Sequence, residues 1–207
     1  LCNELTDQLN TLSDSLGRDS DGLADMGKDL QDRARAAMFS LGATYPELSG
    51  YYPQPKGLLF PAFLSVQNLS GIYSPFTIEA NYNSAMVSYN LPFTICHELS
   101  HLRGFMQEEE ANFIGFLACV NADDTAFNYS GYLLGWIYAT NELYEADYDT
   151  FVEIYNRLSD NVKADLSANS SFWKRYDSKV AEVSGQINDH YLNCLLYTSD
   201  AADDLIG

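Results

Sequence analysis

Two of the three histidines in this chain stand four residues apart, and the segment that holds them constrains how the surrounding chain can fold. His97 and His101 flank Glu98, and residues four apart on an α-helix project from the same face. Gly104 follows closely, and a glycine there is a common helix end because it adopts left-handed backbone angles without strain. The segment therefore predicts a helix over residues 93–103 and a second helix, over residues 107–121, that folds back onto the first.

The spacing of His97, Glu98 and His101 is typical of zinc-dependent hydrolases. Two imidazoles on one helix face can bind the same tetrahedral Zn²⁺, and the glutamate after the first histidine lies beside them. Zinc lowers the pKa of a bound water towards about 7, and the glutamate can accept the proton as the water attacks a carbonyl carbon. We therefore expect Zn²⁺ as cofactor, His97 and His101 as ligands, and Glu98 as the catalytic general base.

The acidic residues that open the second helix supply candidates for a third zinc ligand. Glu108 is the preferred ligand, since Glu108, Ala111 and Asn112 fit the signature of zinc peptidases with a glutamate ligand; Glu109 is the main alternative. A continuous helix would leave Glu108 about 10 Å along the axis from the histidines, so the glycine break is required. Asn112, one turn further on, is expected to orient a ligating histidine by a hydrogen bond.

The remaining pattern predicts an α+β fold that is predominantly α-helical. Apolar residues recur every three or four positions within residues 3–42, which predicts two helices separated near residues 17–22. Residues 45–61 are typical of an irregular connection. Short runs over residues 71–74, 77–82 and 85–89 predict a small β-hairpin or sheet packed against the histidine helix. Further helices are expected over residues 125–144, 148–158, 160–168 and 171–192, and the uncharged stretch 125–141 predicts a central buried helix.

Charge and cysteine content exclude several classes of partner and site. The chain has 29 acidic and 11 basic residues, a formal charge of −18, so we expect it to bind no nucleic acid. Without the C-terminal segment 194–207, three cysteines remain, Cys2, Cys96 and Cys119, and they show neither metal-binding spacing nor a disulfide framework. The stretch from Gly57 to Cys96 carries a single charge, Glu79, which is either a buried structural carboxylate or, as we slightly favour, a site residue. The third histidine, His190, is expected at the surface.

The two ends of the sequence suggest a longer parent protein. We expect residues 1–42 to form a helical segment that links to a missing membrane region, and residues 43–193 to form the zinc-peptidase-like domain. Residues 194–207 resemble a translated sequencing adapter and are treated as a non-native tail, with a genuine frayed C-terminus as the alternative.

Several motifs together resemble an uncharacterised bacterial family, a domain of unknown function in which N-terminal membrane helices precede a zinc-peptidase-like domain. The resemblance implies a membrane-anchored parent protein, with the extracytoplasmic side favoured. More distantly, residues 79–89 and the helix after them are similar to the hairpin and edge strand of thermolysin-type peptidases, which implies that Ala80, Asn81 and Tyr82 line a substrate cleft. The matching motifs are residues 75–83, 92–94, 97–101, 103–104, 108–113 with Ile114 and Leu117, 129–132 and 191–192.

The chain is thus expected to be a zinc metalloendopeptidase that acts on a peptide or protein substrate. Glu79 and Asn81 are candidates for substrate contact, and Tyr129 and Tyr132 are candidates for the hydrogen-bond donor that stabilises the oxyanion. One alternative is a zinc-holding sensor or partner-binding domain that hydrolyses nothing. The other is a structural helical domain in which the histidine motif is accidental.

Overall fold

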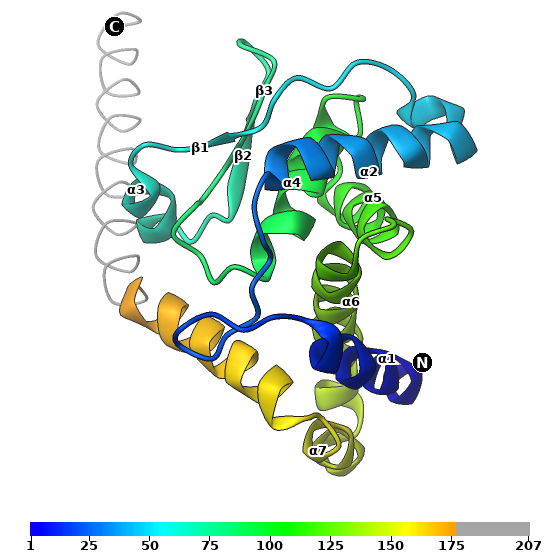
Figure 1. The fold of residues 1–207 in the computed structure, drawn as a ribbon, viewed down its shortest axis with the longest axis vertical. Coiled ribbons are helices and arrows are strands. Elements are labelled where there is room, and N and C mark those ends of the chain that lie inside the picture. Colours follow the sequence, from blue (N-terminus) through cyan, green and yellow to red (C-terminus); the bar gives the residue numbers. More distant parts are fainter. Residues whose placement is uncertain (177–207) are drawn as a thin grey trace, which may run out of the picture.

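The computed structural model describes residues 1–176, and helices dominate this part of the chain (Figure 1). The labelled helices are α1 (Cys2–Ser15), α2 (Leu30–Thr44), the 3₁₀-helix η1 (Pro46–Leu48), α3 (Pro61–Val66), α4 (Asn90–His101), α5 (Glu108–Val120), α6 (Thr125–Ala146) and α7 (Tyr148–Asn156). A further helix covers residues 160–176. The strands are β1 (Lys56–Gly57), β2 (Gly71–Ser74) and β3 (Glu79–Tyr82). The expected α+β, predominantly helical fold is confirmed.

The sheet has three short strands in the order β1-β3-β2, so β3 is central and β2 lies at an edge. β2 and β3 form an antiparallel hairpin in which Gly71 pairs with Tyr82, and β1 runs parallel to β3. The strand expected over residues 85–89 is absent, because the Asn83 side chain accepts a hydrogen bond from the Ala85 N–H and turns the chain. Tyr89 is then fully buried just before α4 begins. The strand β1 and the helix α3 lie where no regular structure was expected.

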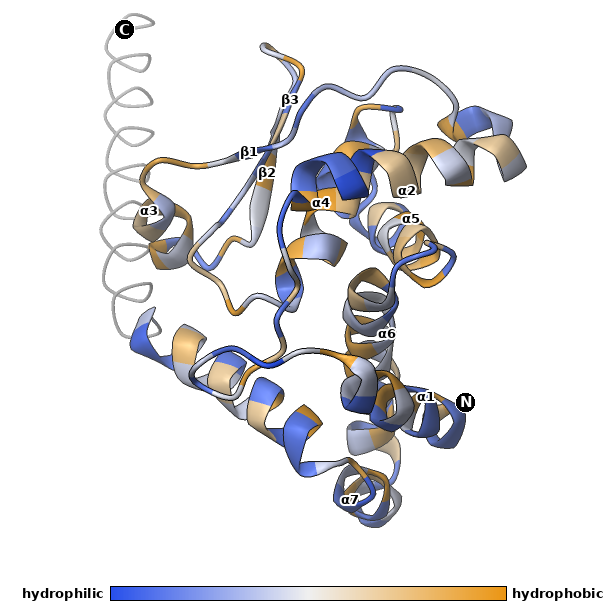
Figure 2. Cartoon of the chain, in the orientation of Figure 1, coloured by the Kyte–Doolittle hydropathy of each residue, from blue (hydrophilic) through white to orange (hydrophobic). Residues whose placement is uncertain are grey.

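Helix α4 occupies the centre of one hydrophobic core, between α2, α5, α6 and the sheet. Every residue of α4 except Leu91 is buried, so the histidine motif does not lie on a solvated surface. Helix α5 approaches closely because Gly115 faces α4: a Cβ atom there would lie 3.3 Å from the backbone nitrogen of His97. Figure 2 shows hydrophobic residues along α5 and α6, whereas the first turn of α2 is hydrophilic.

A second core joins α1, α6, α7 and the 160–176 helix. Helix α6 belongs to both cores, as expected for the uncharged stretch that it contains. Beside this core, the buried Asp165 carboxylate accepts hydrogen bonds from the Arg18 guanidinium, the Ala24 N–H and the Tyr129 hydroxyl. This network fixes the 160–176 helix against the chain that follows α1. Within residues 1–176, no helix combines the length and the apolar character that crossing a membrane requires.

Two helix boundaries differ from those that the sequence indicates. The second helix begins only at Leu30, later than the apolar spacing predicts. Before it, Ala24 and Met26 are buried in an irregular segment, where the Asp19 side chain accepts a hydrogen bond from the Leu23 N–H. The break expected near residue 169 is also absent, because the Asn169 side chain accepts a hydrogen bond from Asn90 instead of competing for its own backbone. The remainder of that expected helix, His190 and the tail 194–207 lie outside the described residues.

Candidate metal centre

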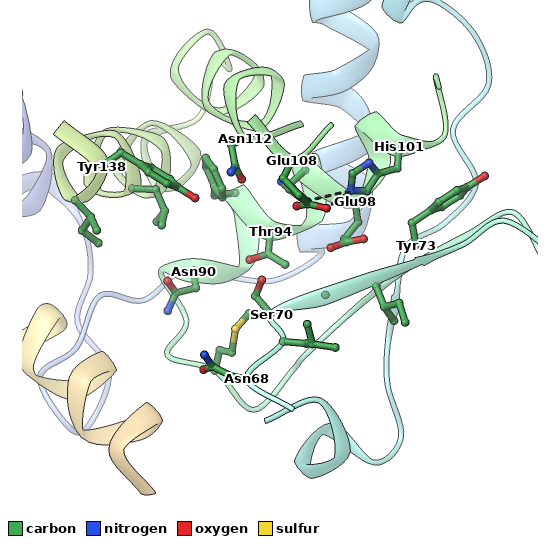
Figure 3. Close-up of a pocket in the computed structure, with 18 of the residues that line it drawn as sticks. Asn68, Ser70, Tyr73, Asn90, Thr94, Glu98, His101, Glu108, Asn112 and Tyr138 are labelled. Atoms are coloured by element: carbon green, nitrogen blue, oxygen red, sulfur yellow. Dashed lines mark hydrogen bonds and ion pairs between the residues drawn. The ribbon is translucent and has the colours of Figure 1, made fainter. Parts of the chain in front are cut away.

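His97, His101 and Glu108 converge at the junction of α4 and α5. Figure 3 shows the His101 and Glu108 side chains at this junction. The Nε2 atoms of the two histidines are 3.2 Å apart, and Oε2 of Glu108 is 3.2 Å from Nε2 of His97. The other carboxylate oxygen of Glu108 is 3.9 Å from Nε2 of His101. Ligands at about 2.0–2.1 Å from a tetrahedral zinc ion lie about 3.3 Å from one another. The spacing of the three side chains therefore fits a tetrahedral metal site.

The turn between the two helices brings Glu108 to the histidines. Helix α4 ends at His101, and Gly104 adopts a φ of +93°, in the left-handed region expected for a glycine that ends a helix. Helix α5 then begins at Glu108. Glu109 and Glu110 are exposed and do not join the cluster. The structure thus brings Glu108, rather than its neighbour Glu109, to the two histidines.

A hydrogen bond orients one imidazole of the cluster, and burial shifts the pKa of the other. The Nδ1–H of His101 donates to the carbonyl oxygen of Phe105 at 2.6 Å, which leaves Nε2 with its lone pair towards the cluster. Burial, and then the nearby His101, lower the pKa of His97, while Glu108 and Asn112 partly oppose this shift. Nδ1 of His97 has no hydrogen-bond partner among the described residues, so the orienting role expected of Asn112 stays a prediction.

Glu98 lies beside the cluster and is not one of its three members. Its side chain is almost fully buried, and its Oε2 atom has no hydrogen-bond partner among the described residues. Burial, with a smaller contribution from the charge of Glu108, raises the pKa of Glu98 to about 8. A carboxyl group with this pKa and an unpaired oxygen can exchange a proton with a small molecule near neutral pH.

The cluster opens into a cavity of about 820 Å³. Among the described residues that line it, Glu98 and Glu108 are the only carboxylates, and none is lysine or arginine. β2 contributes one wall of this cavity, α4 and α6 contribute others, and Trp173 comes from the 160–176 helix. The lining residues are Asn68–Tyr73, Pro75, Met86, Asn90, Phe93, Thr94, His97, Glu98, His101, Met106, Glu108, Asn112, Leu134, Ile137, Tyr138, Asn169 and Trp173.

Four residues that the sequence suggested as further site residues lie away from the cavity lining. Glu79 pairs with Lys56, and hydrogen bonds from Lys56 and Thr77 lower its pKa. Asn81 lies in the central strand β3. The Tyr129 hydroxyl donates a hydrogen bond to Oδ2 of Asp165, at an oxygen–oxygen distance of 2.5 Å. Tyr132 packs edge-on against the ring of Phe116. Ala80 and Tyr82 also point into the helical core, so β2, not β3, is the strand that borders the cavity.

Two tyrosines that the sequence did not single out border the cavity instead. Tyr138, on α6, is half exposed, and its hydroxyl points towards Glu108 in Figure 3. Burial, and then the charge of Glu108, raise the pKa of Tyr138. The ring centre of Tyr73, on β2, is 6.0 Å from that of His101. The helical spacing of Leu134, Ile137 and Tyr138 marks one face of α6, but only the packing shows that this face meets the cavity.

Comparison with known proteins gives a family and no activity. A family model described as "Protein of unknown function (DUF3810)" matches residues 1–195. No curated protein and no solved structure matches the chain. The match agrees with the resemblance to a domain of unknown function, and its description names neither a metal nor a reaction.

Proposed function

The chain belongs to the DUF3810 family of proteins of unknown function, and from the side chains of its site we propose that it is a zinc-dependent peptidase. The observation that carries this proposal is the convergence of His97, His101 and Glu108 at the ligand spacing of a tetrahedral metal, with the carboxyl group of Glu98 beside them.

The donor set favours zinc over calcium and magnesium. Calcium and magnesium prefer sites built from oxygen atoms, whereas two imidazole nitrogens and one carboxylate suit zinc. The lowered pKa of His97 favours the neutral imidazole that ligation requires, and the hydrogen bond from His101 to Phe105 fixes the orientation in which Nε2 of His101 faces the cluster. When bound, zinc would polarise the scissile carbonyl and acidify a water molecule.

The side chains around the cluster supply the remaining chemistry of hydrolysis. Glu98 accepts the proton of the attacking water and passes it to the leaving amine, a role that its raised pKa supports. The Tyr138 hydroxyl donates a hydrogen bond to the substrate oxygen as negative charge develops there. The hydrogen bond to Phe105 holds the His101 ring in the orientation that ligation needs, and we propose that Asn112, which lines the same cavity, does so for His97.

The wall formed by β2 supports an extended peptide as substrate. In the described sheet β2 pairs only with β3, so its outer backbone edge is unpaired and available to a peptide that adds as a further strand. The described lining also lacks a lysine or arginine to bind a terminal carboxylate. Both features favour cleavage within a chain, and hence an endopeptidase that accepts uncharged side chains.

The membrane anchor and the extracytoplasmic side remain part of this proposal and rest on the family resemblance. Fractionation of the full-length parent protein tests the anchor: recovery in the membrane fraction supports it, and recovery in the soluble fraction contradicts it. The strongly acidic composition supports the expectation that the chain does not bind nucleic acid.

Zinc content and peptide cleavage test the proposed reaction together. The purified chain should contain one equivalent of zinc and cleave a library of uncharged peptides. Glu98→Gln should keep the zinc and lose cleavage, and His101→Ala should lose both. Zinc without cleavage under all conditions would favour the non-hydrolytic zinc-holding module, and a chain that binds no zinc would contradict the proposal.

A further inference from the structure

Gly71 on β2 lies directly against the side chain of Glu98 on α4. A Cβ atom added at Gly71 would overlap the Oε1 atom of Glu98 and would lie 2.7 Å from both its Cδ and Cγ atoms. Carbon atoms that are not bonded do not approach this closely. We infer that Gly71 is a positioning residue, whose missing side chain leaves the space in which the Glu98 carboxyl group sits beside the metal cluster. This inference rests on the proposed function for its catalytic consequence, but the contact itself does not.

Backbone conformation does not explain the glycine at this position. Gly71 is not among the residues with positive φ, so an L-amino acid could adopt its backbone angles. Its backbone is extended and pairs with Tyr82 on β3. A glycine normally weakens a strand, since it adds conformational entropy to the unfolded chain and has no side chain to pack. The close approach of Glu98 is therefore the feature that requires a glycine here.

The packing determines which group would move if a side chain were added. β2 is held by its four residue pairs with β3 and by the hydrogen bond from the Asn83 N–H to the Ser70 carbonyl. Every residue of helix α4 except Leu91 is buried. The carboxyl group of Glu98, in contrast, borders the cavity and can rotate into it. A methyl group at position 71 should thus displace the Glu98 side chain while the fold and the three candidate ligands stay in place.

A double-mutant cycle on the full chain tests the contact without zinc or substrate. Gly71→Ala should lower the melting temperature, and this loss should shrink by at least half in a Glu98→Ala background, where the space is free. Gly57→Ala is the matched control, because it also lies in the sheet but its added Cβ would contact Ser84 and Tyr82. Its effect should be the same in both backgrounds. An equal loss for Gly71→Ala in both backgrounds would overturn the inference.

Kinetic measurements test the positioning role. Gly71→Ala should keep zinc content and KM near the wild-type values and lower kcat at least tenfold, whereas Gly57→Ala should keep kcat. A Gly71→Ala variant with wild-type kcat would overturn the positioning role. If the wild-type chain cleaves no peptide while the stability cycle shows coupling, the proposed function fails and the assigned contact stands.

Discussion

The Nδ1–H of His101 donates a hydrogen bond of 2.6 Å to the carbonyl oxygen of Phe105, four residues further along the chain. This bond closes the turn between α4 and α5 onto the imidazole ring. It fixes which nitrogen of His101 faces the cluster, and it restrains the backbone that leads to Glu108. The orientation of one candidate ligand and the position of another are therefore linked through the same short segment.

Substitution of Gly104 should weaken this turn. Gly104→Ala places a side chain at a φ of +93°, which costs about 1–2 kcal/mol of stability, although open space surrounds the added methyl group. We expect a lower melting temperature and weaker zinc binding, because Phe105 and Glu108 shift relative to the histidines. Gly17→Ala is the control, since its Cβ also meets open space at an ordinary φ. Calorimetric zinc titration checks this, and equal zinc affinity in both variants would contradict the coupling.

The two neighbouring glutamates at the start of α5 should differ in their effect on zinc binding. Glu108→Gln removes a candidate ligand and should weaken zinc affinity more than tenfold. Glu109→Gln changes an exposed carboxylate outside the cluster and should leave the affinity unchanged. Because a ligand that binds only the folded state stabilises it by about 2.7 kcal/mol at 100 times its Kd, thermal melts with and without chelator should report the same difference. A larger effect of Glu109→Gln would identify that residue as the ligand.

Two tyrosines on α6 should separate stability from catalysis. Tyr129→Phe removes a donor from the buried Asp165 carboxylate and should cost about 1–3 kcal/mol of stability with little change in kcat. Tyr138→Phe removes a half-exposed hydroxyl and should leave stability nearly unchanged while lowering kcat by about 10²-fold. Chemical denaturation and peptide cleavage assays of both variants measure the two effects. The opposite pattern would restore Tyr129 as the catalytic candidate.

When a chelator keeps the protein free of metal, its free energy of unfolding should depend on pH through Glu98. Burial raises the pKa of Glu98 to about 8 from a usual value of 4.5, so the folded chain retains a proton that the unfolded chain releases between these values. The contribution of this group to the free energy of unfolding is therefore lost as pH rises from about 4.5 to about 8. Glu98→Gln cannot ionise, so its stability should fall less across this range. Urea unfolding at several pH values measures the difference, and parallel pH profiles of the two proteins would contradict it.

Local sequence predicts the helices that build the site better than the sheet beside it. Three local signals predict this part of the site: the histidine spacing, the glycine and the acidic run. Each depends on residues within about one helical turn, so α4, the turn and α5 lie close to their predicted positions. The third expected strand fails because Asn83 closes a local turn with Ala85 and because Tyr89 is buried in the helical core, and only the burial of Tyr89 depends on distant packing. Met26 likewise contributes to an apolar spacing that is typical of a helix, although it is buried in an irregular segment.

The sequence alone determined that two imidazoles and a carboxylate could share a metal, because helical periodicity and one glycine place them within reach of each other. Only the tertiary structure decided what surrounds them. It placed Tyr129 against Asp165 and Tyr138 at the cavity, although both belong to one helix, because which face of α6 meets the site depends on how α6 packs against α1, α4 and α5. It also brought Gly71 against Glu98, since strand pairing and helix packing join segments that no local pattern connects.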